Sequence, residues 1–382
     1  MSINFQFATA SQIIFGNHTI EKVPGIISGF HGNIMVVTGG DTERAKILTD
    51  KLPDPGTVIF FQVKSEPTIE VINQGIQAAR ENNCKYLVGF GGGSVVDAAK
   101  AIAALVPNKG ELLDYLEVIG KGKSLIEKPL PVIAIPTTSG TGAEVTKNSV
   151  IKSEKYSVKV SLRSDFMYPD YAVIDPQLMV SMPPEITASS GVDALTHLME
   201  TYVSNQSNAF IDLFCREGMK RIAFSLEKAY ADGSDLAARE NMAMASLLGG
   251  MALANVKLGA VHGFAGPLGG MFPAPHGTVC ARLLPAVMEM NIRVMNEQKA
   301  GIEKYNEIAR ILTGKESALV EDGIDWVKNI IRRLKIPSLS IFGINEKNYA
   351  EIVQKAKNAS SMKGNPVVLN DDQLMWVLEK SV

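Results

Sequence analysis

Short apolar runs alternate with amphipathic stretches through the first third of the chain. Each apolar run has the length of a buried strand, and the runs occupy residues 34–38, 57–63, 85–90 and 131–136. The stretches between them fit a helical period, as in I-E-V-I-N-Q-G-I-Q-A-A-R at residues 69–80. Strands that alternate with helices predict a mostly parallel sheet with helices on both faces. Residues 1–16 are expected to be extended and to precede this sheet.

The pattern changes in the second half of the chain. Residues 146–175 contain strand-like pieces, and almost everything after Pro184 fits a helical period. The break at Met182-Pro183-Pro184 suits a domain boundary. We therefore predict an α/β domain over residues 1–180 and an all-α helical domain over residues 181–382.

Composition narrows the class of protein. The chain has 382 residues, is nearly half apolar and carries a net charge of −2, so nothing favours binding to nucleic acid or to an anionic membrane. It has no uninterrupted apolar stretch of about 20 residues and no evident signal peptide. The three cysteines have no disulfide or zinc-finger spacing, which suits a reducing compartment. A cytoplasmic protein is expected.

A glycine run follows the predicted strand at residues 85–90. Gly91, Gly92, Gly93 and Ser94 lead directly into a predicted helix. Free amides at a helix N-terminus bind phosphate, and glycines let the phosphate approach closely. The G-x-G-x-x-G fingerprint is absent, and a turn with Ser94 as N-cap and Asp97 as its capping-box partner also explains part of the pattern. From spacing alone, both interpretations stay open.

A second polar loop follows the strand at residues 131–136. It reads P-T-T-S-G-T-G-A-E and spans residues 136–144. Its hydroxyls and glycines are able to bind ribose and phosphate oxygens. Taken by itself, the segment is more typical of an ordinary polar loop.

Histidine is scarce and concentrated. Three of the five histidines lie within residues 191–281, namely His197, His262 and His276. Asp193 precedes His197 by four positions, so on a helix the two share one face. One carboxylate and three imidazoles are a plausible ligand set for a divalent transition metal.

With these motifs in place, the sequence resembles the iron-containing (group III) alcohol dehydrogenases. The resemblance covers essentially the whole chain and rests on the ordered Asp, His, His, His set, on G-G-G-S-x-x-D-x-x-K and on P-T-T-S-G-T-G-A-E. It implies a dehydroquinate-synthase-like fold, with the metal segments in the helical domain facing an interdomain cleft. It also implies a homodimer or higher homo-oligomer.

The resemblance implies site residues as well. Asp193, His197, His262 and His276 would bind Fe(II), which zinc could replace in purified protein. The dinucleotide, NAD or NADP, would be contacted by Gly39, Gly92, Gly93, Ser94, Asp97, Thr137, Thr138, Thr141, Lys159 and Leu178.

Gly39 bears on the choice of dinucleotide. Relatives that prefer NAD often carry Asp at this place, where a carboxylate accepts from the ribose 2′-hydroxyl and repels a 2′-phosphate. Gly39 removes that charge, although Asp41 could reach back to the ribose and Arg44 is a nearby cation. We therefore predict that NADP is accepted and favoured over NAD.

The implied activity is a metal-dependent interconversion of a small primary alcohol and its aldehyde, with NAD(P) as hydride carrier. One departure concerns Gly266, which stands where the family usually has a histidine linked to proton transfer. Another group or water must therefore move the proton here.

Three alternative functions stay open. They are a polyol dehydrogenase or carbonyl reductase of the same superfamily, a dehydroquinate-synthase-like lyase, and a non-enzymatic nucleotide-binding or metal-storage protein. The lyase would need a more basic pocket than residues 182–281 offer.

Overall fold

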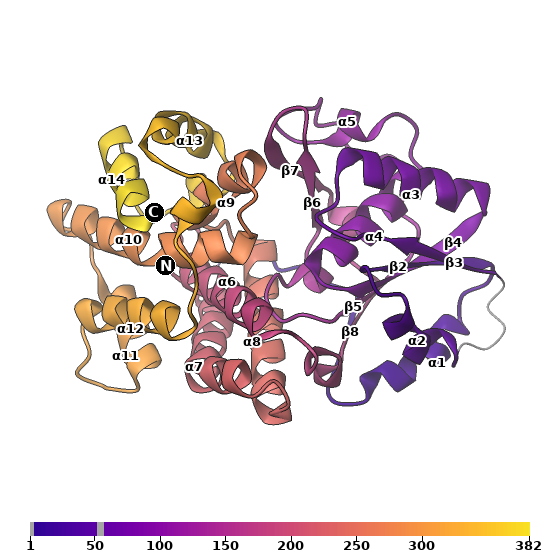
Figure 1. Cartoon of the computed structure of the whole chain (residues 1–382), viewed down its shortest axis with the longest axis horizontal. Coiled ribbons are helices and arrows are strands. Elements are labelled where there is room, and N and C mark those ends of the chain that lie inside the picture. The colour runs from indigo at the N-terminus through magenta and orange to yellow at the C-terminus, as the bar shows by residue number, and fades with distance from the viewer. Residues whose placement is uncertain (1–3, 52–56) are drawn as a thin grey trace. The chain divides into compact units, whose positions relative to one another are not determined.

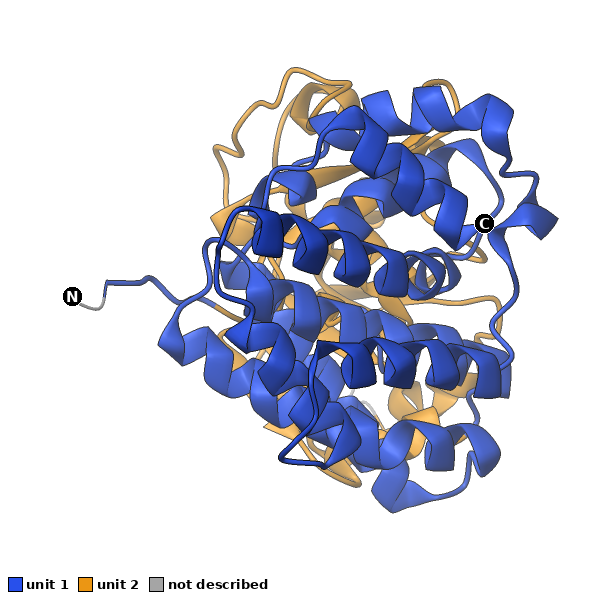
Figure 2. Cartoon of the chain, turned by 90° about the vertical axis from the view of Figure 1, so that its left-hand side faces the viewer, with its two compact units in different colours: residues 1–8, 139–141, 181–382 blue, residues 9–138, 142–180 orange. Residues whose placement is uncertain are grey.

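The structure is a computed structural model that describes residues 4–51 and 57–382. The chain forms two compact units (Figure 2). Of the described residues, one unit contains 9–51, 57–138 and 142–180, and the other contains 4–8, 139–141 and 181–382. That residues 1–180 bind the dinucleotide and residues 181–382 bind the metal remains our proposal.

Among the residues that the structure describes, a six-stranded parallel sheet forms the centre of the first unit; Figure 1 shows its place in the fold. Its order is β1-β8-β5-β4-β2-β3, with pairing such as Val36 to Val88 across β2 and β4. The strands are β1 Gln12–Phe15, β2 Asn33–Thr38, β3 Val58–Gln62, β4 Cys84–Gly91, β5 Val132–Pro136 and β8 Tyr171–Ile174. A separate antiparallel pair consists of β6 Asn148–Ser153 and β7 Val158–Arg163. The predicted parallel sheet is confirmed.

Helices cover both faces of this sheet. Successive side chains of a strand point to opposite faces, and apolar side chains on both faces must be buried. In β2, Met35 and Val37 belong to the core that includes α3 and α4, whereas Ile34 and Val36 belong to the core that includes α1 and α2. The helices are α1 Val23–Ile27, α2 Lys46–Thr49, α3 Ile69–Glu81, α4 Gly93–Leu105 and α5 Leu112–Tyr115. Both strand faces are therefore apolar, which explains the continuous apolar runs.

The N-terminal segment forms less strand than its sequence suggests. Only Gln12–Phe15 enters the sheet, as the edge strand β1 paired with β8. Further upstream, Phe5 and Phe7 pack against the ring of Phe210, with ring centroids 5.0 and 5.1 Å away. Aromatic packing therefore holds the start of the described chain on the helical unit.

The second unit is helical, as predicted (Figure 1). It contains α6 Pro184–Val203, α7 Ala209–Ala231, α8 Leu236–Asn255, α9 Ala260–Met271, α10 His276–Glu297, α11 Glu303–Thr313, α12 Val320–Arg333, α13 Glu346–Asn358 and α14 Asp371–Ser381. One large apolar core runs through these helices. Among the described residues, no single helix has the length and apolar character to cross a membrane, while α8 and α9 pass such a test only as a pair bent by 96°.

Candidate functional site

Helix α6 supplies the first two candidate ligands. It begins at Pro184, whose fixed φ and missing N–H suit a first helical position. Asp193 and His197 lie one turn apart on it, and both are buried. The Oδ1 of Asp193 lies 3.9 Å from the Nε2 of His197.

Two further helices bring His262 and His276 to the same carboxylate. The Nε2 atoms of His262, on α9, and of His276, the first residue of α10, lie 3.5 and 3.6 Å from Asp193 Oδ1. The rings of His197 and His262 stack with centroids 4.6 Å apart. All four predicted metal ligands are therefore gathered around one oxygen atom.

Glycine lets α10 approach α6 at this point. A Cβ built on Gly277 would lie 2.2 Å from the backbone oxygen of Ser189, a distance that no side chain tolerates. Gly277 immediately follows His276 at the start of α10. The absence of a side chain at Gly277 thus allows His276 to reach the carboxylate of Asp193.

Glu200 orients His262. Its carboxylate accepts from Nδ1 of His262 at 2.7 Å and from the backbone N–H of Val261 at 2.7 Å. The pair with Nδ1 leaves Nε2 of His262 directed at Asp193. A carboxylate behind a metal-binding histidine fixes the tautomer and the ring orientation in this way. Gly259 permits the approach, because a Cβ there would lie 2.8 Å from Oε1 of Glu200.

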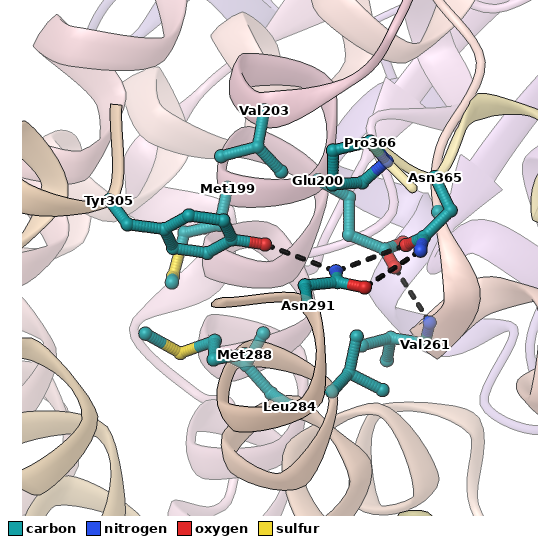
Figure 3. Close-up of a pocket in the computed structure, with 12 residues that line it drawn as sticks. Met199, Glu200, Val203, Val261, Leu284, Met288, Asn291, Tyr305, Asn365 and Pro366 are labelled. Carbon is teal, nitrogen blue, oxygen red and sulfur yellow. Dashed lines mark hydrogen bonds between the residues drawn. The ribbon is translucent and has the colours of Figure 1, made fainter. Parts of the chain in front are cut away.

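A buried amide network supports the start of α9 (Figure 3). The Oδ1 of Asn365 accepts from the backbone N–H of Ala260 and from Nδ2 of Asn291, both at 3.1 Å. Asn291 also donates to the hydroxyl of Tyr305 at 3.1 Å, and its own Oδ1 accepts from Asn365 at 2.7 Å. These bonds satisfy amides that a helix N-terminus otherwise leaves unpaired. The network therefore stabilises the turn that carries His262.

The charges of the cluster suit a cation. Burial favours the neutral form of Asp193, but the three surrounding imidazoles more than offset this and hold the pKa of its carboxyl well below its usual range. Burial lowers the pKa of His197 to about 4. Asp193 is therefore an anion and His197 a neutral base, and both are the forms that bind a metal. Burial opposes the charged form of His262, but its contacts with Cys280, Asp193 and Glu200 outweigh burial and raise its pKa, so metal binding would have to displace a proton from this ring.

The distances and the donor atoms fit a metal ion. Asp193 Oδ1 is buried and has no hydrogen-bond partner among the described residues. Two ligand atoms that are each about 2.1 Å from an ion in tetrahedral geometry lie roughly 3.4 Å apart. The separations of 3.5 and 3.6 Å from Asp193 to His262 and His276 match this value, and that to His197 is slightly longer.

A second candidate site lies at one edge of the parallel sheet. The connection from β2 leads outward to β3, whereas that from β4 leads the other way to β5. Ligands of such sheets bind beyond the carboxyl ends of the strands where the direction reverses. Gly39 follows β2 there, and Gly92 and Gly93 follow β4.

Helix α4 begins within the glycine run. Gly92 is its N-cap and Gly93 its first residue, so the interpretation of Ser94 as N-cap is wrong. Gly92 has no side chain to cap the first amides of α4, and amides at such a helix N-terminus are able to bind a phosphate. A Cβ on Gly92 would meet the side chain of Thr138 at 3.3 Å. The glycine run and the loop after β5 thus lie side by side.

Asp97 and Lys100 fix the C-terminal end of the loop at residues 136–144. The ammonium of Lys100 is fully buried, pairs with Asp97 at 3.0 Å and donates to the carbonyl of Ala143 at 2.8 Å. Asp97 also accepts from the backbone N–H of Val150 at 2.9 Å. The capping-box role considered for Asp97 is therefore wrong, and the residue joins α4 to β6.

The other predicted nucleotide-binding residues differ in their contacts and in their exposure. Lys159 forms an ion pair with Glu66, and the carbonyl of Leu178 accepts from Arg44 at 3.0 Å. A Cβ on Gly39 would meet no atom within 4 Å, so the space beside it is open. Asp41 accepts from the backbone N–H of Glu43 at 2.9 Å. Thr137 is buried, while Thr141 is exposed and belongs to the helical unit.

Sequence reasoning missed two residues that lie against the four candidate metal ligands. Glu200 lies seven positions after Asp193, and Cys280 lies four after His276, so each pair shares a helix face. The Sγ of Cys280 lies 3.7 Å from Nε2 of both His262 and His276. Helical spacing was the signal for both residues, but a Glu or a Cys at such a spacing is too common to be assigned without the fold.

Comparison with known proteins agrees with this architecture. Residues 10–176 match the model for iron-containing alcohol dehydrogenase, and residues 187–382 match that for the C-terminal part of the Fe-containing alcohol dehydrogenase family. The chain is 34% identical to a choline dehydrogenase of Bacillus subtilis over 95% of its own length and 90% of the relative's. These matches show that it belongs to the iron-containing alcohol dehydrogenase family.

Solved structures are similar over the full chain. A 1,3-propanediol oxidoreductase superposes with a TM-score of 0.91 at 29% identity and covers all of both chains. A sulfoacetaldehyde reductase from Bifidobacterium kashiwanohense, in complex with NAD+, gives a TM-score of 0.88 at 29% identity, covering 100% of this chain and 99% of that one. The expected fold is confirmed, and the chain is an alcohol oxidoreductase of this family.

Proposed function

We propose that this protein is a metal-dependent NAD(P) oxidoreductase that interconverts a small primary alcohol and its aldehyde. The observation that carries the proposal is the buried Oδ1 of Asp193, which has three imidazole nitrogens within 3.9 Å and no hydrogen-bond partner among the described residues. Buried anions of this kind are stable only when they are paired or bind a metal.

Asp193, His197, His262 and His276 would hold the metal, which we propose to be Fe(II), with zinc as a substitute in purified protein. When bound, the metal would act as a Lewis acid toward the substrate oxygen, and the dinucleotide would accept or donate the hydride. Glu200 would keep Nε2 of His262 in place through its bond to Nδ1. The hydroxyl proton of the alcohol would leave through water, because Gly266 offers no titratable side chain.

The dinucleotide would bind at the carboxyl edge of the parallel sheet. The amides of Gly93 and Ser94 at the start of α4 would face its pyrophosphate. The hydroxyls of Thr137 and Thr138 would donate to its phosphate oxygens or accept from its ribose hydroxyls. The open space beside Gly39 favours acceptance of NADP as well as NAD. The NAD+ complex of the sulfoacetaldehyde reductase supports a dinucleotide role for this fold.

Names of the relatives support the substrate class. Choline, 1,3-propanediol and sulfoacetaldehyde, which appear in those names, are small primary alcohols or aldehydes. The three cysteines of the chain are free and buried, which supports a reducing compartment such as the cytoplasm.

Metal analysis and a substrate panel test the proposal together. Purified wild type is expected to hold about one metal ion per chain and to oxidise NADH or NADPH only when an aldehyde is present. His276→Ala removes one of the imidazoles, so it should lose most of the metal and the activity. Full metal occupancy in folded His276→Ala would overturn the ligand assignment, and no aldehyde-dependent oxidation across the panel would overturn the reaction.

A further inference from the structure

Cys280 lies inside the proposed metal cluster. It is fully buried on α10, one turn beyond His276. Its Sγ lies 3.7 Å from Nε2 of His262 and the same distance from Nε2 of His276. Asp193, His262, His276 and Cys280 each offer one ligand atom, and these four atoms all lie within 4.8 Å of one another.

The helices present their donors in matched pairs. On α6, Asp193 and His197 are four positions apart, and on α10, His276 and Cys280 have the same spacing. A pair with this spacing points two side chains at one location from a single helix. The location is the same for both pairs, because Oδ1 of Asp193 lies 3.6 Å from Nε2 of His276.

The sulfur distances fit coordination. Nitrogen and sulfur ligands that are about 2.1 and about 2.3 Å from one ion lie roughly 3.1–3.8 Å from each other when their bond angle is about 90–120°, and both Sγ–Nε2 distances are 3.7 Å. Cys280 would then be a fifth protein ligand beside Asp193, His197, His262 and His276. A thiol is also able to donate to one of these nitrogens and accept from the N–H of the other, so a pair of hydrogen bonds is the alternative to coordination that the experiment below must exclude.

We infer that Cys280 is a sulfur ligand of the metal, an inference that rests on the metal-dependent function proposed above. As the metal–sulfur bond forms, the thiol proton leaves to solvent and nothing is oxidised. The thiolate adds a second anion to that of Asp193, so a divalent ion would be neutralised by its ligands. Soft thiolate donors favour zinc over harder, oxygen-seeking ions, and Cys280 would therefore shift the centre toward zinc.

Zinc K-edge X-ray absorption of the zinc-loaded full chain tests the inference. Wild type is expected to show a sulfur scatterer at about 2.3 Å beside nitrogen and oxygen scatterers at about 2.0–2.1 Å. In Cys280→Ser, the sulfur scatterer should disappear while nitrogen and oxygen remain. Cys215→Ser is the matched control, because Cys215 is buried in the same unit but contacts the hydroxyl of Thr201 at 3.3 Å.

A second variant keeps the test decisive if Cys280→Ser does not fold. The chain has three cysteines, so Cys84→Ser combined with Cys215→Ser leaves Cys280 as its single thiol. This double variant should retain the sulfur scatterer, and its cobalt(II) form should show a thiolate-to-cobalt charge-transfer band. Bound zinc with only nitrogen and oxygen scatterers in wild type would overturn the role of Cys280 and leave the proposed function standing. Failure of wild type to bind any metal would overturn both.

Discussion

The carboxylate of Glu200 and Nδ1 of His262 lie 2.7 Å apart in the interior of the helical unit. The same carboxylate accepts from the backbone N–H groups of Val261 and His262 at 2.7 and 3.3 Å. One side chain therefore fixes both the ring of His262 and the first turn of the helix that carries it. This arrangement makes Glu200 a positioning residue for the proposed metal centre.

Glu200→Gln should weaken metal binding without removing a ligand. Glu200 accepts from three N–H donors, and the amide of glutamine would place an NH₂ group opposite some of them. His262 would then lose the hydrogen bond that fixes its ring. Loss of such a partner typically weakens metal binding by about 10–100-fold. Competition with a chromophoric zinc chelator measures this, and Glu185→Gln, at an exposed position of the same helix, is the control. Equal affinity in the two variants would contradict the positioning role.

Gly277→Ala tests the close approach of α10 to α6. The added methyl group would lie 2.2 Å from the backbone oxygen of Ser189, so α10 must move and carry His276 with it. We expect a marked loss of metal from the purified variant, together with a lower melting temperature. Gly25→Ala is the matched control, because a Cβ there meets no atom within 4 Å. Wild-type metal content in Gly277→Ala would show that α10 adjusts without displacing His276.

Gly39→Asp should shift the dinucleotide preference toward NAD. Open space beside Gly39 leaves room for the carboxylate, and a charge facing a 2′-phosphate costs about 1–3 kcal/mol, or roughly 5–150-fold in the NADP/NAD ratio of kcat/KM. Steady-state kinetics with both dinucleotides measure the ratio, with Gly40→Asp as the neighbouring control. A wild type strongly selective for NAD and unmoved by Gly39→Asp would show that this position does not face the ribose.

Glu144 should make stability depend on pH. Burial raises the pKa of this carboxyl from 4.5 to about 7. A raised folded-state pKa means that the stabilising contribution is complete below pH 4.5 and is lost as pH rises through 7. The loss amounts to about 3 kcal/mol.

Urea unfolding of wild type and Glu144→Gln at about pH 5 and about pH 8 compares the two states of this group. Wild type should lose about 2 to 3 kcal/mol more stability between these conditions than Glu144→Gln does, because part of the effect is already lost at about pH 5. The exposed Glu154→Gln variant should behave like wild type. Parallel pH dependence in all three proteins would mean that Glu144 does not titrate in this range.

The edge strand β1 supports the prediction of a homodimer. Gln12–Phe15 pairs with β8 on one side and is the last strand of its sheet. Such an edge presents unpaired N–H and C=O groups that a second copy is able to satisfy. Light scattering at micromolar concentration should give at least twice the chain mass of 41.2 kDa, and a mass of one chain would refute the prediction.

Local pattern was enough to predict most elements of the fold, although the N-terminal segment forms a strand only over Gln12–Phe15. The apolar runs at residues 34–38 and 85–90 are strands, because a parallel sheet buries both faces of each strand and leaves no polar alternation. The helical second half followed from its period of 3.6 residues. Asp193 and His197 were placed on one face by their spacing alone, because both belong to the same helix.

Contacts between distant segments were decided only by the tertiary structure. Asp193 and His276 are 83 positions apart, and no local pattern indicates that Gly277 lets their helices approach. The contacts of Glu200 and Cys280 with His262 were likewise invisible, since a helix face becomes a candidate ligand site only when another helix brings donors to it. The position at which α4 begins was also decided by the tertiary structure. Serine is a favoured N-cap residue, yet the backbone makes Gly92 the N-cap, and no side chain caps the first amides of α4. Sequence therefore determined which elements form and which residues share a face, and packing determined which of those faces meet.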